Sequence, residues 1–278
     1  MTMADKTLQT KDISVLRITR DAVDSGRDCV AIEEPLEIGL NYYAEEGQVH
    51  QTISVTMRTP GEDSELAVGF LFSEGIVEKM SQVEAISGHG DNRIEVTLAA
   101  GHCPDVTRLQ RNFYTTSSCG VCGKASIEAL QTVGAEKLPL GNMRVDRATL
   151  QGLPGALSES QAVFKQTGGL HAAALFDSSG KLLRVREDVG RHNALDKLIG
   201  ACLRAGEAPL HERILLLSGR ISFELVQKAV RAQVPVIAAI GAPSSLAIEL
   251  ATEYGVTTVG FLRDNRFNVY SGQDRIEM

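Results

Sequence analysis

The sequence predicts an α/β protein with a smaller α+β segment at its N-terminus, and three observations support this. Continuous apolar runs joined by helical patterns fill the second half of the chain, as in a parallel sheet covered on both faces. Alternating apolar and polar residues mark strands in the first third. The 278 residues, 43% of them apolar, suffice for one large or two modest domains that need no disulfide or metal to fold.

Residues 12–101 are expected to form the small α+β domain. Alternating patterns predict half-buried strands at 50–58 and 93–99. Between them, Thr59 is predicted to be the N-cap and Pro60 the first residue of a helix that ends near Gly75. The apolar stripe of this helix is Leu66, Phe70 and Leu71.

The segment 102–140 is predicted to be a connection that carries a cysteine-containing loop, and 141–278 to be the α/β domain. Helical patterns occupy 146–165, 193–205, 222–232 and 244–254. Strands are expected at 171–176, 181–187, 213–218, 234–240 and 256–262, the first two as a hairpin. The chain contains no internal repeat.

Composition excludes several classes of protein. With 28 basic and 35 acidic residues, the net charge of −7 argues against a general nucleic-acid or membrane-surface binder. No apolar stretch is long enough to span a membrane, and the N-terminus lacks the apolar core of a signal peptide. The five cysteines do not form a disulfide framework. We therefore expect a cytoplasmic location.

The strongest single signal is the sequence Cys119-Gly-Val-Cys122 at the start of a predicted helix. The positive end of the helix dipole lowers a thiol pKa toward the reactive range. A zinc site would need His102 and Cys103 to complete its ligands, and a thioredoxin-like dithiol would need a preceding buried strand. An exposed, mobile thiol that carries a group between partners fits the glycine-flanked loop best. Two inert cysteines remain the alternative without function.

A second signal comes from the residues that follow the predicted strands. In parallel sheets, ligands bind outside the carboxyl ends of the strands. The arginines, hydroxyls and glycines there predict an anionic, phosphate-bearing ligand. These residues are Asp188, Arg191, His192, Ser218, Gly219, Arg220, Gly241, Pro243, Ser244, Ser245, Arg263 and Arg266.

Two histidines do not predict acid–base catalysis or a zinc deaminase. His171 and His192 have no partner fixed by spacing, so we assign them no catalytic role. Zinc deaminases require H-x-E followed by P-C-x-x-C, whereas Ala173 stands at the glutamate position and Ser118 at the proline position. We therefore predict no metal site.

Seven motifs, in order along nearly the whole chain, resemble the FdhD family. They are GFLFSEGI (69–76), SSCGVCG (117–123), HAAAL (171–175), EDVGRHNALDKLIG (187–200), SGRISFELVQKA (218–229), GAPSSLAIELA (241–251) and GFLRDNRFNVY (260–270). Members of this family are sulfur carriers that mature formate dehydrogenases. The resemblance implies a homodimer whose larger domain has a cytidine-deaminase-like α/β/α fold without the zinc chemistry.

The resemblance also implies a mechanism. A cysteine desulfurase would supply sulfane sulfur, held as a persulfide on Cys119. The sulfur would pass to the molybdenum bis(molybdopterin guanine dinucleotide) cofactor before its insertion into formate dehydrogenase. Cys122 would assist release or protect the persulfide, and the sequence leaves both open. The implied cofactor-binding stretch is Phe261, Leu262, Arg263, Asp264, Asn265 and Arg266.

The cofactor is cargo in this mechanism, and no permanent cofactor is expected. A different class of function stays open, namely a non-catalytic chaperone that only binds and delivers the cofactor.

Overall fold

The computed structural model describes residues 9–90, 92–104, 136–139 and 143–277. Strands are β1 (Thr10–Ile18), β2 (Val23–Ala31), β3 (Glu34–Ala44), β4 (Gly47–Arg58), β5 (Val83–Gly88), β6 (Arg93–Leu98), β7 (Val145–Asp146), β8 (His171–Asp177), β9 (Leu182–Asp188), β10 (Arg213–Leu217), β11 (Val236–Ala239), β12 (Thr257–Arg263), β13 (Arg266–Ser271) and β14 (Ile276–Glu277). Helices are α2 (Asp63–Ser73), α5 (Arg147–Ser160), α6 (Phe164–Thr167), α7 (Arg191–Arg204), α8 (Phe223–Arg231) and α9 (Ser245–Glu253), with 3₁₀ turns at Met80–Gln82 and Gln273–Arg275. The predicted mixture of helices and sheets is confirmed.

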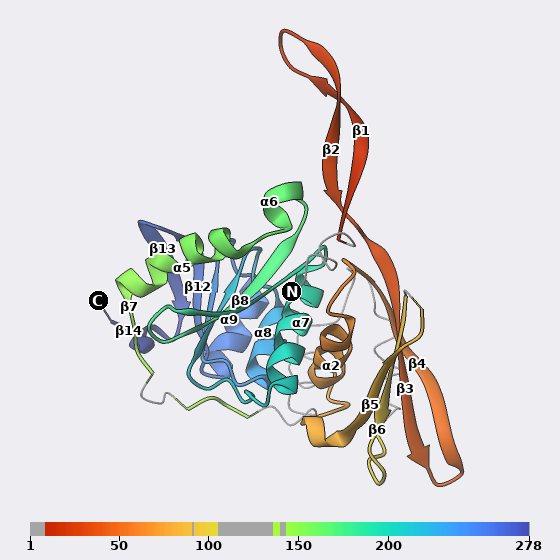
Figure 1. Cartoon of the computed structure of the whole chain (residues 1–278). Coiled ribbons are helices and arrows are strands. Elements are labelled where there is room, and N and C mark those ends of the chain that lie inside the picture. Colours follow the sequence, from red (N-terminus) through yellow and green to blue (C-terminus); the bar gives the residue numbers. More distant parts are fainter. Residues whose placement is uncertain (1–8, 91, 105–135, 140–142, 278) are drawn as a thin grey trace.

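A six-stranded sheet with the order β13-β12-β11-β10-β8-β9 forms the centre of the C-terminal part (Figure 1). The prediction of a parallel sheet is only partly right, because β10, β11 and β12 are parallel whereas β8, β9 and β13 pair antiparallel with their neighbours. The reason is the length of the connections. The turns from β8 to β9 and from β12 to β13 are too short for the crossover that a parallel pair requires.

Helices cover both faces of this sheet, as predicted. On one face, α5 packs on side chains of β8, β10 and β11, with Leu150, Leu153 and Leu157 in the core. On the other face lie α7, α8 and α9. Because successive strand residues point to opposite faces, neighbours such as Leu215 and Leu216 belong to different cores.

The N-terminal part holds a second sheet, with the order β4-β3-β6-β5, and helix α2 packs against it. The predicted strands 50–58 and 93–99 are confirmed. The predicted helix start is wrong, because α2 begins at Asp63 and Glu62 is its N-cap in a left-handed conformation. Thr59 lies outside the helix because its N–H donates to Asp188 and its carbonyl accepts from Lys197. These tertiary contacts override the local capping signal.

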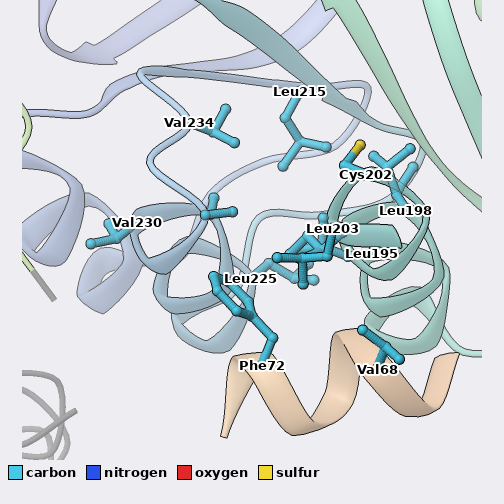
Figure 2. Packing of buried hydrophobic residues seen from close by; sticks show 14 of the residues in the cluster. Val68, Phe72, Leu195, Leu198, Cys202, Leu203, Leu215, Leu225, Val230 and Val234 are labelled. Atoms are coloured by element: carbon cyan, nitrogen blue, oxygen red, sulfur yellow. The ribbon is translucent and has the colours of Figure 1, made fainter. Parts of the chain in front are cut away.

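Helices α2 and α7 cross at very short distance and join the two parts of the chain. A Cβ on Gly69 would lie 1.9 Å from the carbonyl oxygen of Asp196, and one on Gly200 would lie 1.9 Å from that of Glu65. Only glycine at both positions allows this approach. Figure 2 shows the result, with side chains of α2 lying against those of α7 and α8 in one continuous core. The predicted boundaries between 12–101, 102–140 and 141–278 stay a prediction.

Candidate functional site

The carboxyl ends of four strands lie at one edge of the six-stranded sheet. Strands β10, β11 and β12 are parallel, and β9 runs in the same direction because both β9 and β10 are antiparallel to β8. The residues that follow these strands therefore gather at this edge, as predicted, together with His171 at the start of β8. We call this region the strand-end site. It comprises His171 and the segments 188–192, 218–222, 241–245 and 260–266.

Glycine turns bring the strand ends into contact with one another. A Cβ on Gly241 would lie 2.7 Å from the carbonyl oxygen of Gly219, and one on Gly219 would lie 3.2 Å from Nδ1 of His171. The backbone N–H of Phe261 donates to the carbonyl of Gly241 at 3.0 Å. Three strand ends are thus fixed against each other with backbone exposed to close approach, as binding of a phosphate group requires.

Phe261 has an unusual backbone conformation, with a φ of 52°, and its side chain is 43% exposed. A bulky residue in the left-handed region costs about 1–3 kcal/mol and persists only where its surroundings impose it. Here the hydrogen bond to Gly241 and an irregular register between β12 and β13 impose it. The strain holds an aromatic ring at the site, where it can stack on a planar base.

In the rest of the predicted cofactor-binding stretch, the groups that could contact a ligand are mainly polar side chains and backbone atoms. Leu262 is fully buried in the core beneath α5, so only its backbone can meet a ligand. Arg263 donates through Nη1 to the carbonyls of Ile240, at 2.8 Å, and Leu262, at 2.7 Å, which orients its guanidinium at the edge. The remaining three residues are exposed, namely Asp264, Asn265 and Arg266.

Helix α7 begins at this edge with Arg191 and His192, and no acidic residue lies in its first turn. Gly190 is its N-cap and offers no side-chain oxygen to the free N–H groups. The positive end of the dipole of a fourteen-residue helix therefore coincides with a cationic side chain. Both favour an anion at the strand-end site.

Asp188 was predicted to be one of the residues that face the ligand, but the structure gives it a structural role. Its carboxylate is fully buried, 2.8 Å from Nζ of Lys197, and accepts from the N–H groups of Gly190, at 2.8 Å, and Thr59, at 3.2 Å. It therefore fixes the start of α7 against the N-terminal part. Sequence reasoning missed Lys197, because nothing in its spacing distinguishes it from a solvent-facing lysine.

Two histidines of the site, His192 and His171, interact with nearby charged groups. His192 lies 3.3 Å from Oγ of Ser222 and 3.6 Å from a carboxylate oxygen of Glu224, and its interaction with Glu224 lowers the pKa of that carboxyl to about 2. The pKa of His171 lies below its ordinary value, first because the ring is buried and then because Arg191 and His192 are near. Nearby positive charge therefore contributes to the lowered pKa of His171, Asp188 opposes it, and a bound anion would raise this pKa.

The predicted catalytic cysteines, Cys119 and Cys122, lie outside the described residues. Cys103 is exposed, and Nε2 of His102 lies 3.3 Å from the carbonyl oxygen of Ile76. Within the described ranges, no three His, Cys, Asp or Glu side chains are grouped to hold a metal. The zinc hypothesis needs both cysteines of the pair, so it remains a hypothesis. No helix in the described part of the chain is long and apolar enough to cross a membrane.

Fold and site together define an α/β protein whose strand ends bring together basic side chains, glycine turns and a helix N-terminus, groups that suit an anionic ligand. Comparison with known families gives the particular assignment. The FdhD/NarQ family model matches residues 31–277, and the chain belongs to this family. The predicted resemblance is confirmed.

Curated relatives and a solved structure agree with this assignment. The chain is 48% identical to the sulfur carrier protein FdhD of Streptomyces coelicolor, over 97% of this chain and 96% of that protein. It is 44% identical to the protein of the same name from Sulfurisphaera tokodaii, over 97% of this chain and 100% of that one. A crystal structure from Desulfotalea psychrophila, assigned as a formate dehydrogenase accessory protein, matches with a TM-score of 0.75 and 26% identity, covering 97% of this chain and 100% of the other.

Proposed function

We propose that this chain is a sulfur carrier that matures formate dehydrogenase. The sulfurtransferase accepts sulfane sulfur from a cysteine desulfurase as a persulfide on Cys119. It then transfers the sulfur to the molybdenum bis(molybdopterin guanine dinucleotide) cofactor before the cofactor enters formate dehydrogenase. The proposal places the protein in the cytoplasm as a homodimer, with a cytidine-deaminase-like larger domain. The observation that carries it is the match to sulfur carrier proteins over 97% of the chain.

The strand-end site supports the second half of this function. The cofactor is cargo rather than a resident group, and it carries phosphates and guanine bases. Arg191, Arg263 and the N-terminus of α7 suit the phosphates, because they concentrate positive charge and free N–H groups. The exposed ring of Phe261 suits a base. The predicted stretch 261–266 is therefore chemically matched to one guanosine half of the cargo.

The Cys119-Gly-Val-Cys122 sequence supports the first half. In loading, the Cys119 thiolate attacks the outer sulfur of the desulfurase persulfide, and the desulfurase thiolate leaves. The bond between the two desulfurase sulfurs breaks as the bond to Cys119 forms, so no external oxidant or reductant takes part. Glycines at 120 and 123 give the backbone the freedom that such an exchange between two proteins requires.

Intact mass spectrometry after incubation with a cysteine desulfurase and cysteine tests the loading step. The wild type is expected to gain about 32 Da, one sulfur, and to lose it with a reductant. Cys119→Ala is expected to gain nothing, whereas Cys122→Ala still gains it. An unmodified wild type beside an active desulfurase would refute the carrier chemistry.

The chaperone alternative differs in what the cysteine contributes. If the protein only binds and delivers the cofactor, Cys119→Ala supports formate dehydrogenase activity in a strain that lacks the chromosomal copy. If it carries sulfur, the same variant abolishes activity. Titration with guanosine diphosphate is the control, since Cys119→Ala keeps its affinity in either case and Arg263→Ala loses it. Stoichiometric zinc in protein purified without chelator would instead favour the metal-site hypothesis.

A further inference from the structure

Beyond its base, where β2 contacts α6, the hairpin β1–β2 stands clear of the rest of the molecule (Figure 1). Its two nine-residue strands form a two-stranded sheet of their own. At about 3.3 Å per residue, the turn at its end lies about 30 Å from its base. We call this hairpin the arm.

The end of the arm is apolar. Leu16, Ile18 and Val23 are 61%, 72% and 63% exposed. They lie on one face, because Leu16 and Ile18 are two residues apart and Ile18 is paired directly with Val23. An isolated two-stranded hairpin is at best marginally stable in water, and large exposed apolar residues beside open strand edges bind other chains. This cluster, the arm tip, has the character of a surface that is covered in use.

A second exposed apolar cluster lies at the base of the arm. Val55 and Met57 on the edge strand β4 are 63% and 48% exposed, and Met57 pairs across the strands with the exposed Pro35. Only two residues separate the end of β2 from the start of β3, so these three side chains adjoin the arm. We call them the base patch.

We propose that the arm is a dimerisation element. Two copies of this chain associate about a two-fold axis with their arms antiparallel, and the arm tip of each lies on the base patch of the other.

Symmetry favours a second copy as the occupant. A two-fold interface is reciprocal, so the contact of tip with patch occurs twice. When the axis passes halfway along two antiparallel arms of equal length, each tip necessarily reaches the other base. One arrangement thus covers both exposed clusters, about 30 Å apart on one chain, and leaves neither for another partner.

The distribution of charge also favours contact between two copies through their arms. Two chains of net charge −7 repel each other over most of their surfaces. The arm is neutral as a whole, with four basic and four acidic residues, so the rest of the chain carries the entire net charge. The charged residues of the arm are Lys11, Asp12, Arg17, Arg20, Asp21, Asp24, Arg27 and Asp28. Contact between two arms therefore adds no repulsion between net charges to the interface.

This inference deepens the proposed function and rests on its homodimer. The arm ends at Ala31, the residue at which the match to the family model starts. Its role is separate from the sulfur chemistry. The gain of about 32 Da that depends on Cys119 tests that chemistry whether or not the protein dimerises.

Light scattering on the full chain during size exclusion gives the first test. The wild type is expected at twice 29.9 kDa. The double variant Leu16→Asp/Ile18→Asp is expected to weaken the dimer by roughly a hundredfold or more, because it introduces charge into both tip contacts. Leu183→Asp changes an apolar side chain on β9 that is 42% exposed, and it is expected to leave the dimer intact. A monomeric wild type overturns the homodimer, and a dimeric double variant overturns only the arm.

Cross-linking tests the antiparallel arrangement. Ile18→Cys/Met57→Cys is expected to form a disulfide-linked dimer on mild oxidation, and neither single variant exceeds the background of the parent chain. Cross-linking by Ile18→Cys alone would mean contact of tip with tip and would overturn the arrangement. Because both positions are exposed in the monomer, far-UV circular dichroism of the variants is expected to match that of the wild type.

Discussion

The contact between α2 and α7 makes a strong prediction about stability. Gly69→Ala would place a methyl group 1.9 Å from the carbonyl oxygen of Asp196, in a crossing that is also closed on its other side by Gly200. Both obstacles are helix backbone, which cannot move aside as a side chain does. To restore an ordinary contact of 3.4 Å, the helices must separate by about 1.5 Å.

The magnitude follows from three contributions. Overpacking a core costs about 1–3 kcal/mol, and a methyl group against backbone belongs at the upper end. Separation also strains the hydrogen bond of 2.8 Å from Ser73 on α2 to the buried Asp196 on α7, worth about 1 kcal/mol. Alanine regains about 1 kcal/mol of helix propensity over glycine. We therefore expect Gly69→Ala to lower the free energy of unfolding by about 3 kcal/mol.

Urea unfolding followed by far-UV circular dichroism measures this loss, since the chain has no tryptophan. The melting temperature is expected to fall by roughly 6–12 °C. Gly152→Ala is the matched control. It lies inside helix α5 with nothing within 4 Å of its Cβ position, so it is expected to stabilise by about 0.5–1 kcal/mol. A Gly69→Ala protein as stable as the control would refute the reasoning from the crossing.

Three further predictions concern charged groups. Lys197→Met leaves the carboxylate of Asp188 buried without its cation and is expected to cost about 3–5 kcal/mol in urea unfolding, unless Asp188→Asn is added. Because the pKa of Glu224 is lowered from 4.5 to about 2, its ionised form stabilises the fold above pH 4.5 and this contribution disappears as the pH falls toward 2. Glu224→Gln should therefore be less stable than the wild type at neutral pH, and the difference should vanish as the pH falls through about 2. Pyrophosphate at the strand-end site is expected to raise the lowered pKa of His171, measured by proton NMR of the ring, and an unchanged pKa would argue against binding there.

Periodicity predicted the helices and strands well, because burial of one face leaves a regular pattern. In α7, which matches the helical pattern predicted at 193–205, Leu195, Leu198 and Cys202 are buried on one face. The same pattern says nothing about strand direction. A strand buried on both faces is continuously apolar whether its neighbours are parallel or antiparallel, so β8 and β9 were placed in the right hairpin but in a sheet expected to be parallel.

Contacts between distant residues set the limit of prediction. The capping pattern after Thr59 is a valid local signal, yet its N–H is bound by Asp188, 129 positions away. The edge at which the strand-end residues gather was predictable because strands joined by helices, such as β10, β11 and β12, run parallel and end at the same edge of the sheet. The arm was not distinguished from the other strands of the N-terminal segment, since Leu16 and Ile18 alternate with polar residues as in any half-buried strand.

The crossing of α2 and α7 also links the N-terminal part to the strand-end site. Helix α7 is rigid over its fourteen residues and carries Arg191 at the end that belongs to the strand-end site, so a shift forced at Gly69 is transmitted to that end. The buried pair of Asp188 and Lys197, which ties the same end to Thr59, resists this shift. Gly69→Ala should consequently weaken binding of guanosine diphosphate at temperatures well below its melting point, whereas Gly152→Ala should not. Equal affinities in the two variants, measured by calorimetric titration, would show that the site depends on the C-terminal sheet alone.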